Sequence, residues 1–113
     1  MIKYLVILFV GSMLTIEANS QQGPVEMYAA KIAVRMKDTL SLTDSQKQAI
    51  YSVSKQLGEQ QKAVWVQYAH SDSLIQVHLQ QLENSRDALY QPILGDEKFI
   101  LYRQKKRLLL NNN

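Results

Sequence analysis

The stretch Leu42-Thr43-Asp44-Ser45-Gln46 marks the start of a helix in the middle of the chain. The hydroxyl of Thr43 can accept a hydrogen bond from the backbone N–H three residues later. The side chain of Gln46 can reach back to the N–H of Thr43, and the two bonds together make a capping box. Asp44 adds negative charge at the positive end of the helix dipole. The pattern therefore predicts that a helix begins at about Thr43.

Apolar residues recur at helical spacing on both sides of this start. Gly23-Pro24 opens a first helix, because Pro is tolerated in an initial turn. The apolar face of this helix consists of residues spaced by four or three positions, namely Val25, Ala29, Ile32, Met36 and Leu40. Ser41-Leu42 interrupts the pattern, and the second helix is expected from about Thr43 to Tyr68.

Two further helices are expected in the second half of the chain. Ser71-Asp72-Ser73 supplies cap residues for the third helix, and Pro92 is expected to end or kink it. Asp96 then begins a shorter fourth helix. The sequence shows no strand-like alternation, so we predict an all-α domain. Three long helices and a shorter C-terminal helix are expected to pack as hairpins.

The first twenty residues have the pattern of a secretory signal peptide. Lys3 precedes an apolar run from Tyr4 to Ile16, and Ala18-x-Ser20 puts small residues three and one positions before a cut. An uncleaved membrane anchor is the alternative, but a spanning helix needs about 20 apolar residues. We therefore expect residues 1–20 to be removed and residues 21–113 to form one exported domain.

The size and composition of this domain bear on its partners. A domain of fewer than 100 residues has a modest core, and disulfides cannot reinforce it because the chain has no cysteine. We therefore expect a homodimer. The formal net charge of +3 weakly favours anionic partners and gives no argument for nucleic acid.

A weaker copy of the capping motif follows half a chain later. Leu94-Gly95-Asp96-Glu97-Lys98 has the same layout as Leu42 to Gln46, with Gly in place of Thr and Lys in place of Gln. With the signal peptide and the helical body, these motifs resemble the Spy/CpxP-like LTxxQ family of periplasmic stress proteins. Leu42, Thr43 and Gln46 would be its motif residues. The resemblance implies a periplasmic helical protein, often a curved dimer, acting as an ATP-independent chaperone, a modulator of envelope-stress signalling, or a metal sensor.

The sequence offers little for catalysis or for cofactor binding. It has no thiol nucleophile, Gly-rich phosphate loop or Ser nucleophile elbow. His70 and His78 are eight residues apart, which is about 12 Å along one helix and too far for a shared metal ion. We expect both to be surface or boundary imidazoles. The sequence therefore predicts a protein that is not an enzyme and has neither a metal site nor a cofactor.

A second stripe runs along the predicted second helix, apart from its core face. Its members recur at spacings of four and three: Tyr51, Lys55, Gly58, Lys62, Trp65 and Ala69. Aromatic rings separated by lysines suit a surface that holds unfolded polypeptide, so Tyr51, Lys55, Lys62 and Trp65 are the candidate binding residues. The alternative is that this stripe packs against another helix or a second subunit.

Two groups of cations need an explanation of their own. Arg86 falls in the apolar stripe of the third helix and is expected to snorkel or to pair with a carboxylate. The basic run Arg103-Gln104-Lys105-Lys106-Arg107 suits a helix C-terminus, where cations oppose the negative end of the dipole. Docking of this run to an anionic membrane surface is a weaker alternative.

Together these features favour a non-enzymatic periplasmic chaperone or envelope-stress accessory protein that binds unfolded or partner polypeptides. A regulatory protein that docks on the sensor domain of a membrane kinase is the alternative. A metal-stress sensor or buffer is less favoured, because the histidines are far apart.

Overall fold

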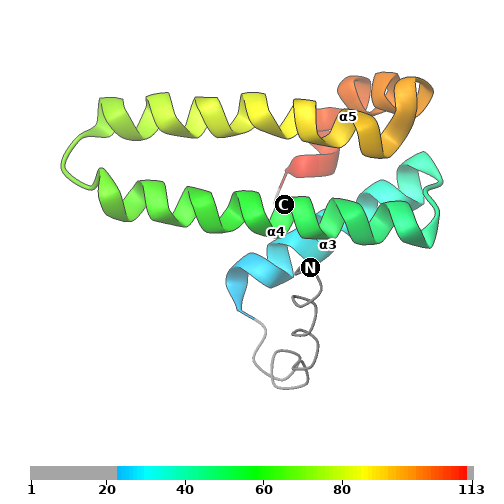
Figure 1. Ribbon diagram of the computed structural model, residues 1–113, viewed down its shortest axis with the longest axis horizontal. Coiled ribbons are helices and arrows are strands. Elements are labelled where there is room, and N and C mark those ends of the chain that lie inside the picture. Colours follow the sequence, from blue (N-terminus) through cyan, green and yellow to red (C-terminus); the bar gives the residue numbers. More distant parts are fainter. Residues whose placement is uncertain (1–22, 112–113) are drawn as a thin grey trace, which may run out of the picture.

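The computed structural model describes residues 23–111 and is all-helical in that range, which confirms the predicted class (Figure 1). The helices are α3 (Pro24–Leu40), α4 (Asp44–Gln67) and α5 (Asp72–Leu110). The expected signal peptide, residues 1–20, lies outside the described residues. None of the helices between residues 23 and 111 combines the length and the hydropathy needed to cross a membrane.

Local capping sets the start of each helix. The side chain of Glu26 accepts a hydrogen bond of 3.1 Å from the N–H of Gly23 at the start of α3. At the start of α4, Gln46 N–H donates to Thr43 Oγ1 at 3.1 Å, and Thr43 N–H donates to Gln46 Oε1 at 2.9 Å. The expected capping box is therefore formed. The hydroxyl of Ser71 accepts from the N–H of Leu74 and caps α5 with this single hydrogen bond.

α5 runs from Asp72 to Leu110 and joins two helical parts across a kink at Gly95, so the shorter C-terminal helix expected from Asp96 is not recorded as a separate element. Pro92 lies inside this helix and does not end it. The backbone departs from helical geometry at Gly95, where φ is 81° and ψ is 163°. These angles fall in a region that is essentially restricted to Gly. A single residue therefore redirects the chain without leaving a loop between two helices.

The chain folds back on itself at Gly95. Asp87 Oδ1 accepts hydrogen bonds of 2.9 Å from both Tyr102 Oη and Lys106 Nζ. In a straight helix, residues fifteen positions apart would be more than about 20 Å apart. The part of α5 after Gly95, coloured orange to red, accordingly turns back at the right of Figure 1.

All three helices contribute to one core. Its fully buried members include Ile32 and Met36 from α3, Ile50 from α4, and Tyr90 and Tyr102 from α5. The rings of Tyr90 and Tyr102 meet edge to face with centroids 5.3 Å apart, which is a favoured aromatic geometry. This contact joins the two parts of α5 on either side of Gly95.

A close approach of α3 to α4 occurs at Gly58. This residue is buried, and a Cβ atom placed on it would lie 2.8 Å from Cγ1 of Val25. A side chain at position 58 would therefore collide with α3. The stripe predicted on α4 thus contains one residue whose lack of a side chain allows the two helices to pack.

Arg86 is buried in the core, where its guanidinium forms hydrogen bonds with neighbouring side chains. Glu83 accepts two hydrogen bonds from its guanidinium, at 3.2 Å and 3.1 Å. Nη1 of Arg86 donates to Tyr90 Oη at 3.1 Å, and Tyr90 Oη lies 2.5 Å from Ser54 Oγ on α4. Burial by itself would lower the pKa of Arg86, but its interactions with Tyr90 and Glu83 outweigh burial and raise it. The prediction that Arg86 pairs with a carboxylate is confirmed.

The α4–α5 hairpin extends beyond α3, as the left half of Figure 1 shows. We call residues 60–82 the hairpin tip. Gly58 is the last buried residue of α4, and Ile75 is the only residue of the tip that is buried. The core therefore lies at the base of the hairpin, where α3 and the end of α5 cover it.

Candidate polypeptide-binding surface

Three of the four residues predicted on α4 line two different grooves against α3. Tyr51 is half-buried at the edge of the core and lines a groove of about 190 Å³ with Lys47 and with Val34 of α3. Lys62 and Trp65 line a second groove of about 350 Å³, which shares no residue with the first. No single groove is therefore lined by all four candidates. Lys55 is half-buried and belongs to neither groove.

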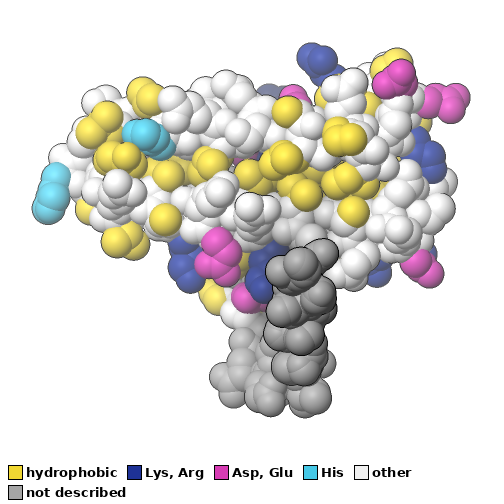
Figure 2. Space-filling model, viewed as in Figure 1, with side chains coloured by type: hydrophobic (Ala, Val, Ile, Leu, Met, Phe, Trp, Pro, Cys, Tyr) yellow, Lys and Arg dark blue, Asp and Glu magenta, His cyan; other side chains and the backbone are white. Residues whose placement is uncertain are grey.

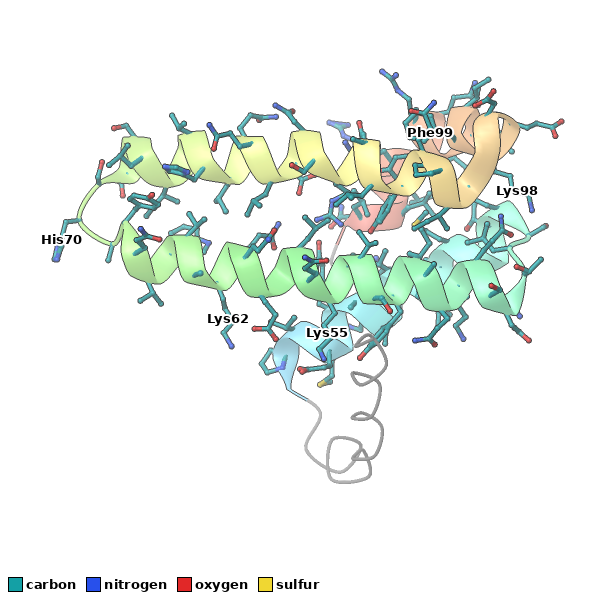
Figure 3. All side chains as sticks on the ribbon, viewed as in Figure 1. Lys55, Lys62, His70, Lys98 and Phe99 are labelled. Atoms are coloured by element: carbon teal, nitrogen blue, oxygen red, sulfur yellow. The ribbon has the colours of Figure 1, made fainter. Side chains whose placement is uncertain are left out.

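The groove at Trp65 joins the start of α3 to the middle of α4, and we call it the Trp65 groove. Its lining consists of Pro24, Val25, Tyr28, Gly58, Gln61, Lys62 and Trp65. The side chain of Trp65 is 55% exposed although it is large and apolar. In Figure 3, Lys55 and Lys62 both point from α4 toward the side where α3 begins and away from α5. An aromatic surface and a cation therefore lie together at this groove.

This combination gives the groove a defined chemistry. An exposed indole loses its contact with water when an apolar side chain covers it. The ammonium of Lys62 attracts acidic side chains, with a strength that falls as salt is added. Val25 and Tyr28 of α3 extend the apolar surface. The groove can thus hold short segments of a chain that carry both apolar and acidic residues.

A third groove lies between α4 and α5 in the hairpin tip and measures about 440 Å³. His78 is stacked on Tyr68 within it, with ring centroids 4.2 Å apart and an interplanar angle of 6°. Figure 2 shows hydrophobic side chains along the seam between the two helices. Residues 60–82 of the hairpin tip include two Asp, Glu, Lys or Arg residues, namely Lys62 and Asp72. The hairpin tip is therefore poor in charge and partly apolar on its surface.

The two histidines do not meet. His70 is exposed in the turn between α4 and α5 and points away from the molecule in Figure 3. His78 lies in the seam against Tyr68. Among residues 23–111, no three His, Asp or Glu side chains are grouped so that they could hold a metal ion.

Sequence reasoning missed the contacts that join the two motifs. Nε2 of Gln46 donates to the carbonyl of Ile93 at 3.0 Å, and Nζ of Lys98 donates to the carbonyl of Ser41 at 2.6 Å. Each donor is the fifth residue of its motif, and each acceptor is the residue before the other motif. Leu42 and Leu94, the first residues of the two motifs, are both buried in the core cluster. The similar spacing of the motifs was a signal for this pairing, but local rules give no contact between them.

Sequence reasoning also missed the residues that α3 contributes to the Trp65 groove. Val25 was assigned to a core face, and Tyr28 was not singled out. The sequence analysis also did not name the partners of Arg86, although their helical spacing was a signal for them, because Glu83 and Tyr90 stand three and four positions from it.

Neither a family model, nor a curated protein, nor a solved structure matches this chain.

Proposed function

We propose that this protein is a non-enzymatic periplasmic chaperone or envelope-stress accessory protein that binds unfolded or partner polypeptides at the Trp65 groove. The observation that carries the proposal is the exposed indole of Trp65 beside Lys62 and Tyr28. Folded proteins bury most large aromatic side chains, and an exposed one in a lined groove suits recognition. Shallow apolar contacts with a nearby cation support reversible binding of many sequences.

The joined motifs support membership of the LTxxQ family. Gln46 both caps α4 and holds the carbonyl of Ile93, so one side chain stabilises a helix start and the fold-back of α5. Lys98 provides the matching contact with the carbonyl of Ser41 although it cannot make a capping box. The periplasmic location is part of the same proposal and rests on the expected signal peptide.

The hairpin tip supports a homodimer. Its exposed apolar residues are Trp65, Val66, Leu74 and Val77. Interface cores are depleted of charge and enriched in aromatic residues, as the tip is. A contact between two tips through Leu74 and Val77 would bury apolar surface and leave the Trp65 groove open, because neither residue lines that groove. Sedimentation equilibrium tests the dimer directly.

A regulatory protein docking on the sensor domain of a membrane kinase is the alternative. The common orientation of Lys55 and Lys62 favours an acidic partner surface. Saturable binding to one such domain, with no effect on aggregating proteins, would support this alternative.

Suppression of aggregation tests the proposed function. Insulin reduced by dithiothreitol is a suitable probe, because this chain has no cysteine for the reductant to affect. Trp65→Ala is expected to weaken suppression by on the order of tenfold if binding covers about 60 Å² of the indole. Lys62→Glu should weaken it most at low salt.

Matched variants separate this effect from changes of the surface in general. Val66→Ala removes an apolar side chain that is 79% exposed next to Trp65 but outside the groove. Lys31→Glu makes the same charge change on the exposed surface of α3. Both variants should suppress aggregation as the unchanged protein does. Unchanged protein that fails to slow aggregation at molar excess would contradict the proposal.

A further inference from the structure

The part of α5 that follows Gly95 carries an exposed face that the Trp65 groove does not use. Tyr102 and Leu109 are buried on the inner side of this segment, and Phe99 and Lys106 are half-buried beside them. The opposite side carries Ile100, Leu101 and Leu108, which are 58%, 39% and 70% exposed. Both sides of the segment are therefore apolar, although only the inner side meets the core.

The exposed apolar residues form one strip. Leu101, Gln104 and Leu108 follow one another at spacings of three and four, and Ile100 is four residues from Gln104. Residues with these spacings lie on one face of a helix. Arg103 and Arg107 border the strip on one side and Lys105 borders it on the other, since each residue turns the helix by about 100°. All three cations are exposed.

The cations that flank this strip are not matched by acidic residues along its length, although an acidic residue lies at its start. Glu97 is exposed and lies three and four residues before Ile100 and Leu101, and the positions after it contribute only positive charge. Lys106 is held by Asp87, but Arg103, Lys105 and Arg107 are at the surface. The guanidinium of Arg103 lies 6.0 Å from the ring centre of Phe99. Lysine and arginine on both sides of an apolar strip can lay their stems along it and extend their charges outward.

We propose that this face, Ile100 to Leu108 with its flanking cations, docks on an anionic lipid surface. In such docking the apolar strip enters the boundary between headgroups and acyl chains, while the cations contact the phosphates. An amphipathic segment that is cationic on both flanks fits this occupant. A protein interface would be depleted of charge, as the hairpin tip is. The proposal does not depend on polypeptide binding, because the strip and the Trp65 groove share no residue.

Vesicle flotation tests the proposal with residues 21–113, which contain every helix and the whole core cluster described. The probes are vesicles of phosphatidylcholine alone and vesicles containing phosphatidylglycerol. We expect binding to the anionic vesicles only, and weaker binding as salt rises. Lys105→Gln combined with Arg107→Gln should reduce partitioning by about 25-fold, because each cation near an anionic surface contributes about fivefold.

Control pairs make the test specific. Lys31→Gln with Lys47→Gln removes the same charge from other surfaces and should bind as before. Ile100→Ser with Leu108→Ser should reduce partitioning at least tenfold, whereas Val66→Ser with Val77→Ser should not. Absence of binding, equal binding to both vesicle types, or equal loss in the two charge pairs would overturn the proposal. An anionic protein as the true occupant would give the first of these results.

Discussion

The side-chain amide of Gln46 donates a hydrogen bond of 3.0 Å to the backbone carbonyl of Ile93, two residues before the non-helical backbone of Gly95. Carbonyls in the last turn before a helix break lack their usual N–H partners. Gln46 supplies a donor to one of them from another helix. The same side chain accepts from the N–H of Thr43, so the start of α4 and the fold-back of α5 depend on one residue.

Substitutions at Gln46 should separate its two roles. Gln46→Glu keeps an acceptor for the N–H of Thr43 but loses the donor to Ile93. It should lower the free energy of unfolding by about 1–2 kcal/mol, since a partly buried carbonyl loses its partner. Thr43→Ala should cost about 1 kcal/mol through the cap alone. Urea denaturation measures both. Equal stability of Gln46→Glu and the unchanged protein would mean that the contact with Ile93 contributes nothing.

Gly95→Ala should lower the free energy of unfolding by about 1–3 kcal/mol. The effect is conformational, because a Cβ at this position meets no other atom within 4 Å. Thermal and urea melts measure it. Gly95→Ala should lower the free energy of unfolding by the same amount when neighbouring side chains are shortened. A steric clash would instead be relieved by shortening them.

Gly58→Ala should also destabilise the protein, but through a collision with Val25, since Ala is otherwise favoured over Gly in a helix. Shortening the side chain of Val25 should therefore restore part of the lost stability. We expect the double variant Gly58→Ala with Val25→Ala to be more stable than the sum of the two single changes predicts. A double-mutant cycle of urea melts measures this coupling. Strict additivity would show that α3 does not approach α4 at Gly58.

Asp87 should make stability depend on pH in acid. Burial alone would raise the pKa of Asp87, but hydrogen bonds from Lys106 and Tyr102 outweigh it and lower the pKa. Its stabilising effect is therefore present above its unfolded pKa of about 3.9 and is lost as pH falls through the lower folded value. Unchanged protein should be more stable than Asp87→Asn at pH 6, and the difference should shrink below pH 4. Lys106→Gln should weaken this dependence, and a constant difference would contradict the assignment.

Substitution of Glu83 should lower the free energy of unfolding more than substitution of Arg86. Glu83→Gln leaves a buried guanidinium without its carboxylate, and hydrogen bonds to charged groups contribute about 1.5–3 kcal/mol. Arg86→Met removes the charge together with its need for a partner, and the half-exposed Glu83 can then be hydrated. Chemical denaturation of the two variants measures which of them has the lower free energy of unfolding. The reverse order would mean that Arg86 contributes mainly through its contacts with Tyr90.

The helix starts could be read from the sequence because their causes are local. Gly23-Pro24, Thr43 and Ser71 each act within one turn, and the structure begins its helices beside them. The course of the chain beyond Pro92 could not be read in this way. A proline argues for a helix end, yet the departure from helical geometry comes at Gly95 and its direction depends on contacts with Asp87 that are distant in sequence.

The candidate site was predictable only in part for the same reason. Helical spacing put Lys62 and Trp65 on one face of α4, apart from its core face. It could not show that α3 supplies Val25 and Tyr28 to the same groove, or that Tyr51 lines another one. Which helix covers which face is decided by packing between helices, and no local pattern encodes it.

The uneven distribution of the core has a consequence for how the hairpin moves. Amide protons in the hairpin tip should exchange with solvent through local opening at a lower free energy than those near Ile50 and Tyr90, because few buried contacts must break. Opening of the tip leaves the base of the hairpin intact. The base of the hairpin thus stays folded while the hairpin tip opens locally. The surface of the tip can therefore adapt to a binding partner without unfolding of the core.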